Sequence, residues 1–155
     1  MTPSIARTQL TADYSIPKII NGGWQLATGH ALAHALDMKD AHNAFAELLD
    51  RGFDTFDCAD IYTEVEAFYG QIIAERRRAG LSLPQIHTKF VPDLKDLAHV
   101  DRAYVERVIE RSLSRLGVER LDMVQFHWWD YDVPGMIDTA GELMRLQEKG
   151  LIRCI

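Results

Sequence analysis

Residues Phe56 to Tyr62 read FDCADIY, and the predicted fold follows from this stretch and two others like it. In each of them an apolar run gives way to polar side chains, here Asp57 and Tyr62. The same change occurs in IHTKF, which contains Lys89, and in LDMVQFHWWD, which contains His127. Successive βα units that curl into a barrel bring the C-terminal ends of their strands to one rim. The four polar side chains are therefore predicted to converge.

Around these stretches, apolar runs alternate with helical patterns along the whole chain. The starts of the runs recur every roughly 30 to 35 residues, which is the size of one βα unit with its return loop. Five strands are predicted, at Lys18 to Gly22, Phe53 to Asp57, Ile86 to Phe90, Leu121 to His127 and Leu151 to Ile155. Four helices are predicted between them, ending near Gly52, Gly80, Gly117 and Gly150. Thr63 and Glu66 have the spacing of a capping box for the second helix, and Asp101 is predicted to cap the third.

An alternation of strands and helices predicts an α/β fold with a parallel sheet. An open doubly wound sheet and a (β/α)8 barrel both fit, but Asn21-Gly22-Gly23-Trp24 lacks the GxGxxG pattern of the open dinucleotide-binding fold. Polar groups at successive strand ends favour the TIM-type barrel. Such a barrel needs about 250 residues, so residues 1–155 are predicted to form one partial domain: four βα units and a fifth strand. Residues 1–15 are expected to be flexible or a short N-terminal extension.

Composition narrows the class of partners. The chain has 155 residues and a formal net charge of −6 at pH 7, so neither nucleic acid nor an anionic membrane is an expected partner. Cys58 and Cys154 form no CxxC pair, which is typical of a reduced compartment. The first 17 residues contain no apolar run long enough for a signal peptide or a membrane span. A cytoplasmic protein is expected.

The four polar residues, brought together, form a proton-transfer site. A tyrosine has a reference pKa of about 10, and a nearby cation lowers that pKa and makes the hydroxyl a usable proton donor. Lys89 is the expected cation, Asp57 its counter-charge, and His127 a hydrogen-bond donor to a substrate oxygen. Such a site would protonate an oxygen while another group adds to its carbon. This is half of a carbonyl reduction.

These motifs resemble those of the aldo-keto reductase superfamily, whose barrel enzymes carry an Asp, Tyr, Lys, His tetrad in this order. The resemblance runs from about Ile16 to Ile155 and covers the first half of the family's fold. It implies that Tyr62 is the general acid, that Lys89 and Asp57 tune it, and that His127 orients the carbonyl. It further implies reduction of an aldehyde or ketone by NADPH, with NADH as the alternative. No metal site is expected.

The resemblance also assigns the walls of the site. Gly22, Gly23, Trp24 and Asp57 are expected to border the cofactor, and Trp24 and Trp128 to wall the substrate pocket. Gly23 stands where the family often has threonine, and Thr63 where it has glycine or asparagine. The loops that grip the cofactor's phosphate come from the second half of the family's barrel.

Three hypotheses for the chain remain open at this point. It is the N-terminal part of a reductase that needs a C-terminal half, or two copies pair through exposed barrel edges, or it is a non-catalytic interaction module or an inactive fragment that retains the fold. Two other features are interpreted as structural. His30 and His34 have metal-pair spacing but no intervening HExxH glutamate, and Cys58 is expected to be a packed thiol.

Overall fold

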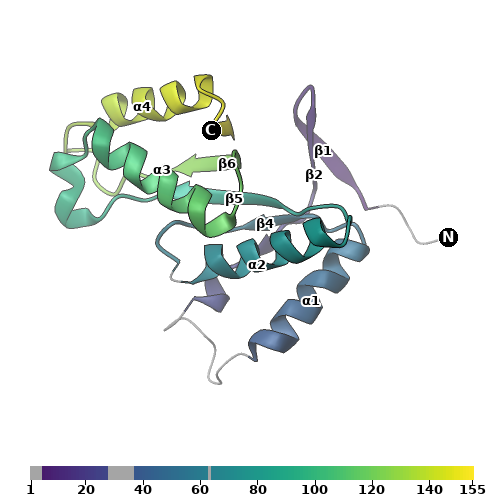
Figure 1. Ribbon diagram of the computed structural model, residues 1–155. Coiled ribbons are helices and arrows are strands. Elements are labelled where there is room, and N and C mark those ends of the chain that lie inside the picture. Colours follow the sequence, from purple (N-terminus) through teal and green to yellow (C-terminus); the bar gives the residue numbers. More distant parts are fainter. Residues whose placement is uncertain (1–4, 28–36, 63) are drawn as a thin grey trace.

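The computed structural model describes residues 5–27, 37–62 and 64–155. Its centre is a parallel sheet of five strands in the order β3-β4-β5-β6-β7 (Figure 1). The strands are β3 (Asn21–Gly22), β4 (Thr55–Asp57), β5 (Gln85–Phe90), β6 (Leu121–Phe126) and β7 (Ile152–Cys154). Each strand pairs with the next one along the chain. A doubly wound sheet reverses its strand order, whereas a barrel does not. The order therefore confirms the predicted α/β arrangement of barrel type.

Helices connect the strands in sequence. They are α1 (Met38–Asp50), α2 (Val65–Arg78), α3 (Arg102–Leu116) and α4 (Met136–Glu148), and they lie next to one another in this order (Figure 1). Two short 3-10 helices, η1 (Trp24–Leu26) and η2 (Leu94–His99), follow β3 and β5. Among the described residues, no helix is both long and apolar enough to cross a membrane.

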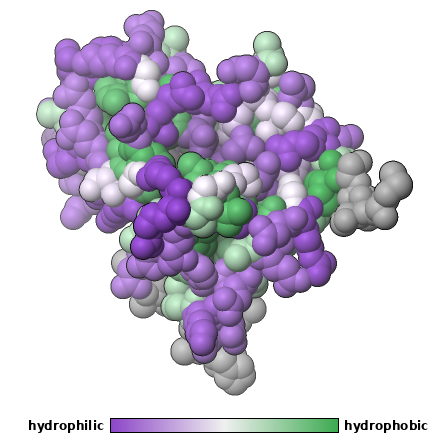
Figure 2. Space-filling view, turned by 45° about the vertical axis from the view of Figure 1, so that its right-hand side comes forward, coloured by the Kyte–Doolittle hydropathy of each residue, from purple (hydrophilic) through white to green (hydrophobic). Residues whose placement is uncertain are grey.

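The alternation of side chains along each strand separates the core from the site. Phe56, Ile86 and Val124 are buried in the core between sheet and helices. The ring of Phe56, for example, lies 4.8 Å from that of Phe45 on α1. Asp57 and Lys89 project from the other face, because successive side chains of a strand point to opposite sides. Figure 2 shows one face of the molecule, where apolar patches lie within a largely hydrophilic surface.

A β-hairpin precedes the sheet, formed by β1 (Arg7–Thr11) and β2 (Tyr14–Pro17). It lies at the N-terminal ends of the sheet strands: the Tyr14 hydroxyl is 2.8 Å from His87 Nε2, and Gln85 Nε2 donates to Ser15 O at 3.1 Å. Of the two alternatives for residues 1–15, flexible or a short N-terminal extension, the hairpin fits the second for Arg7 to Ser15. These residues form an extension with its own structure, which was missed because all five residues of β1 are exposed and show no apolar alternation.

Two of the predicted helix ends can be compared in detail. Asp101 caps α3 as predicted, because its side chain accepts from Tyr104 N at 2.8 Å, and Gly117 ends this helix with a φ of 65°. The predicted capping box of α2 is wrong. Glu64 is the N-cap residue, and Glu66 is fully buried, where its carboxylate accepts from the Thr88 hydroxyl at 2.8 Å. Thr63 lies outside the described residues.

Candidate active site

Asp57 and Lys89 form the centre of the predicted site. The Lys89 ammonium lies 2.7 Å from each carboxylate oxygen of Asp57 and donates to the carbonyl of Cys58 at 2.8 Å. Gln125 Nε2 also donates to Asp57 Oδ1, at 2.9 Å. Sequence reasoning missed Gln125, although it lies two residues before His127 and in register with Lys89. The parallel register pairs Asp57 with His87 and Lys89 with Gln125, so the amine and the amide reach the acid from the next pair along β5 and β6.

Tyr62 follows a turn after β4, in which Tyr62 N donates to Ala59 O at 3.0 Å. Its ring centre lies 5.3 Å from the Lys89 ammonium. Burial, followed by the charge of Asp57, raises the pKa of the Tyr62 hydroxyl above its ordinary value. The expected lowering by Lys89 is not found here, because Asp57 already compensates the charge of the ammonium. Tyr62 therefore holds its proton firmly at neutral pH.

Three members of the tetrad share one pocket. Tyr62, Lys89 and His127 line a cavity of about 280 Å³, together with apolar residues. The full lining is Trp24, Ala59, Ile61, Tyr62, Lys89, Val91, His127 and Trp129. Asp57 does not line this cavity, and it contacts the ammonium of Lys89 from behind. The structure thus brings an un-ionised phenol, an amine and an imidazole to a pocket with apolar walls.

The loop after β3 forms one side of this pocket. Gly23 N donates to Asp57 O at 2.9 Å and places Trp24, which is half exposed, at the pocket wall. A side chain at Gly23 would not fit, because its Cβ would lie 2.7 Å from the Tyr69 hydroxyl. At Gly22, by contrast, no other atom lies within 4 Å of a Cβ, so this backbone is open to close approach.

The tryptophan expected in the substrate pocket is replaced by its neighbour. Trp128 is only 5% exposed, and its indole nitrogen donates to Val133 O at 3.2 Å. Trp129 lines the pocket instead, with its ring centre 4.4 Å from that of His127 in an edge-to-face contact. Its indole nitrogen donates to Pro92 O at 2.8 Å and fixes the ring. The sequence could not predict which of the two tryptophans faces the pocket. β6 ends at Phe126, so the alternation of side chains along a strand does not extend to residues 128 and 129.

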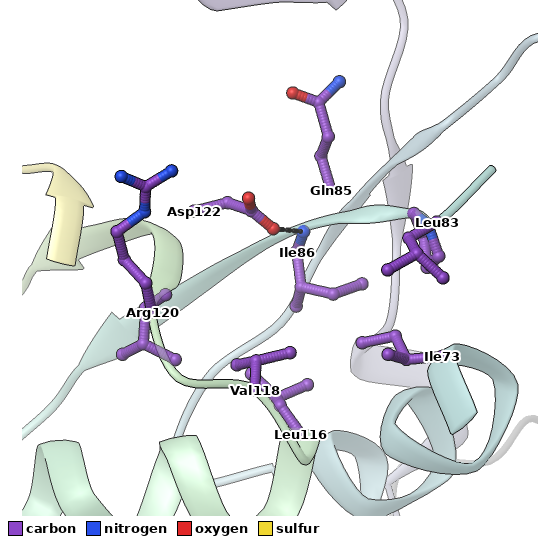
Figure 3. Close-up of a pocket in the computed structure, with 10 residues that line it drawn as sticks. Ile73, Leu83, Gln85, Ile86, Leu116, Val118, Arg120 and Asp122 are labelled. Carbon is purple, nitrogen blue, oxygen red and sulfur yellow. Dashed lines mark hydrogen bonds between the residues drawn. The ribbon is translucent and has the colours of Figure 1, made fainter. Parts of the chain in front are cut away.

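A slightly larger cavity, of about 300 Å³, lies away from the tetrad (Figure 3). Its residues include the first residues of β5 and β6, so it occupies the opposite end of these strands. The side chains of Ile73, Leu83 and Leu116 give it apolar walls, and Asp122 Oδ2 accepts from Ile86 N at 2.9 Å above them (Figure 3). It brings no titratable group near Tyr62.

Two further predictions concern residues outside the tetrad. Cys58 is completely buried, which confirms a packed thiol, and burial raises the pKa of this thiol. A buried, protonated thiol is a poor nucleophile. His30 and His34 lie outside the described residues.

Known proteins are similar to this chain in sequence and in fold. Residues 18–155 match the model of the aldo/keto reductase family. The chain is 31% identical to aldo-keto reductase YhdN of Bacillus subtilis, over 98% of this chain and 45% of that protein. Its fold is similar to that of an aldo-keto reductase from Bacillus halodurans in its holo form, with a TM-score of 0.74, 24% identity, and 97% of this chain and 49% of that chain covered. A Bombyx mori aldo-keto reductase in complex with NADP gives a TM-score of 0.74 at 22% identity, with the same coverage. The chain thus spans about half the length of the proteins it matches, and it belongs to the aldo/keto reductase family.

Proposed function

We propose that this chain carries the proton-donating half of an NADPH-dependent reductase that converts an aldehyde or ketone to an alcohol. The observation that carries the proposal is the shared pocket of Tyr62, Lys89 and His127. A carbonyl oxygen placed between the Tyr62 hydroxyl and the His127 ring would accept hydrogen bonds from both. Tyr62 would then transfer its proton to that oxygen as negative charge develops there.

The Lys89–Asp57 pair supports this step from behind. The ammonium lies beside the phenol ring, where its attraction for a phenolate is balanced by the carboxylate of Asp57. Asp57 and the Cys58 carbonyl hold the ammonium in place. The Tyr62 pKa is raised above its ordinary value, so the hydroxyl keeps the proton that it would donate until a carbonyl is bound.

Residues at the end of β3 fit a flat cofactor ring. The open backbone of Gly22 and the half-exposed ring of Trp24 lie beside the pocket, and Asp57 anchors this loop through Gly23. NADPH, when bound, would supply the hydride for the carbonyl carbon. The preference for NADPH over NADH is supported by the structural neighbour in complex with NADP. We further propose that a C-terminal half completes the barrel and the grip on the cofactor phosphate.

The first test is a titration of the 155-residue chain with NADPH, and in parallel with NADH, followed by tryptophan fluorescence. Trp24 and Trp129 line the pocket and should report binding. Saturation at micromolar NADPH would show that the chain alone forms a cofactor site. No binding up to millimolar NADPH would show that it needs its other half.

Turnover is then measured in a completed barrel, in which residues 1–155 are joined to the C-terminal half of the Bacillus subtilis relative. Tyr62→Phe should abolish carbonyl reduction in this protein and leave NADPH binding nearly unchanged. Reduction that survives Tyr62→Phe would refute the assignment of Tyr62 as the proton donor.

A further inference from the structure

Asp60 is the buried acid of the turn that carries Tyr62, and all four of its polar positions are bonded. Its backbone N–H donates to Lys89 O at 3.3 Å, and its Oδ1 accepts from Val91 N at 3.0 Å. Its Oδ2 accepts from Arg111 at 2.9 Å, and its carbonyl accepts from Arg115 at 2.9 Å. The Asp60 side chain is only 1% exposed. One residue thus ties the turn to β5 on one side and to α3 on the other.

Two of these bonds fix the backbone at the end of β5, one at Lys89 itself and one at Val91, the first residue beyond the strand. Lys89 and Val91 both line the active-site pocket, and Asp60 binds the backbone of each. Asp60, two positions before Tyr62, thus holds the turn that leads to Tyr62 against the backbone of two residues of the pocket wall. Asp60 is not itself among the residues that line the pocket, so its effect on a substrate would act through the residues that it holds, Tyr62 among them.

A second buried acid secures the other side of the same segment. Glu66, in the first turn of α2, accepts from the Thr88 hydroxyl on β5 and lies 3.2 Å from Arg115. Arg115 thus holds both Asp60 and Glu66, the residues that flank Tyr62 in the sequence. The segment between them is clamped to α3 at both ends.

We propose that Asp60 is a positioning residue for carbonyl reduction, which holds the Tyr62 hydroxyl over the pocket by anchoring the Ala59–Tyr62 turn to β5 and α3. This inference rests on the proposed function only in that Tyr62 is taken as the proton donor. Proton transfer depends steeply on geometry, and a misplacement of about 1 Å can cost on the order of 100-fold in rate. A turn bonded at four points restricts such a misplacement.

The charge of Asp60 adds a pH dependence to this anchor. Burial raises the pKa of Asp60 to about 6, opposed by its bonds to Val91 N and Arg111, while Glu66 raises it further. Arg111 and Arg115 from α3 and Glu66 from α2 are the charged groups that contact or face it, and Asp93 and Tyr104 line the adjoining cavity of about 260 Å³. Below about pH 6 Asp60 takes up a proton and its ion pair with Arg111 weakens.

The direct test uses Tyr62 as a reporter in the 155-residue chain, without any turnover. The chain has five tyrosines, so 13C-labelled tyrosine gives few NMR signals, and Tyr62→Phe identifies the one wanted. Asp60→Asn should shift the ring signals of Tyr62 and lower the pKa of its hydroxyl toward the reference value of about 10. Asp93→Asn is the matched control, because Asp93 lines the same cavity but is exposed and does not bond the turn.

Turnover in the completed barrel gives the second measurement. Asp60→Asn should lower kcat by about 100-fold while the Kd for NADPH stays within about twofold. The wild-type protein should lose activity below about pH 6, and Asp60→Asn should lack this step. A purely structural role would lower stability without this split between kcat and Kd.

The outcomes separate the two proposals. If Tyr62→Phe retains activity, the proposed function fails, whereas the NMR result for Asp60 still decides the positioning role. An unchanged Tyr62 signal and titration in Asp60→Asn overturns the inference. If Asp60→Asn does not fold, Arg111→Gln replaces it, since this variant keeps the bond from Val91 N. In Arg111→Gln, a change of the Tyr62 ring signals and hydroxyl pKa in the same direction as expected for Asp60→Asn, but smaller, supports the inference. No change in either overturns it.

Discussion

Lys89 and Asp57 form a bidentate ion pair, with the ammonium nitrogen 2.7 Å from both carboxylate oxygens. Each side chain is only about a quarter exposed, so water screens the pair weakly. The pair accounts for two properties of the site. It keeps the ammonium beside the Tyr62 ring, and it removes the net positive charge that would otherwise lower the pKa of the phenol.

The first prediction concerns this pair. Lys89→Met leaves a part-buried carboxylate whose one remaining side-chain donor, within the described part of the chain, is Gln125. It should lower the free energy of unfolding by about 1–3 kcal/mol. Asp57→Asn should cost a similar amount, and the double variant less than the sum. Urea unfolding of all four proteins gives the coupling energy, which is expected at about 0.5–3 kcal/mol. Strict additivity would mean that the pair is no more than a surface contact.

The second prediction contrasts two glycines in helices. A Cβ at Gly70 on α2 would lie 2.2 Å from the carbonyl oxygen of Arg115 on α3, so the two helices could not keep their present approach. Gly70→Ala should therefore destabilise the protein by about 1–3 kcal/mol. Gly141 on α4 has no other atom within 4 Å of a Cβ. Gly141→Ala should stabilise by about 0.5–1 kcal/mol, since alanine loses less backbone entropy. Thermal unfolding would measure both changes in stability. If both variants were stabilised or both destabilised, the close approach of α2 and α3 at Gly70 would be contradicted.

These contacts show which parts of the fold the sequence could predict. The apolar runs, the helix ends at glycines such as Gly117 and the rim position of Lys89 follow from local patterns that repeat along the chain. Glu66 was misassigned because its spacing from Thr63 is local, whereas its partner Arg115 lies 49 residues away. The ion pair of Asp60 with Arg111 was not predicted for the same reason, because the two residues are 51 positions apart. A buried ion pair between distant segments leaves no periodic signal in a single sequence.

The third prediction concerns pH and the N-terminal hairpin. His87 is buried against the Tyr14 hydroxyl, and burial lowers the pKa of its ring. His87 therefore takes up a proton near pH 6.5 in the unfolded chain, but only at a lower pH in the folded chain. Its contribution to the stability of the fold is present above about pH 6.5 and is lost as the pH falls below that value. Asp60 acts in the opposite sense, because its pKa is raised to about 6 and folding favours its protonated form.

A comparison of variants isolates the contribution of His87 from that of Asp60. The side chain of His87→Gln can still accept from Tyr14 but cannot take up a proton. Its destabilisation relative to the wild type should be larger at about pH 7.5 than at about pH 5.5, because only the wild type loses this stability on acidification. Urea unfolding at the two pH values measures the difference. A difference independent of pH would show that His87 does not titrate in this range.

The fourth prediction separates the two adjacent tryptophans. Trp129 lines the pocket beside His127 and is half exposed, whereas Trp128 is buried and lies 3.6 Å from the Cβ position of Gly135. Trp129→Phe should change the relative kcat/KM for bulky and small aldehydes in the completed barrel and leave stability within about 0.5 kcal/mol of the wild type. Trp128→Phe should instead leave a cavity and lower the free energy of unfolding by about 1–3 kcal/mol, with little change in selectivity. Each variant serves as the control for the other, and each needs both assays. If Trp128→Phe shifted selectivity and Trp129→Phe did not, Trp128 would wall the substrate pocket, and the present assignment of the two rings would be reversed.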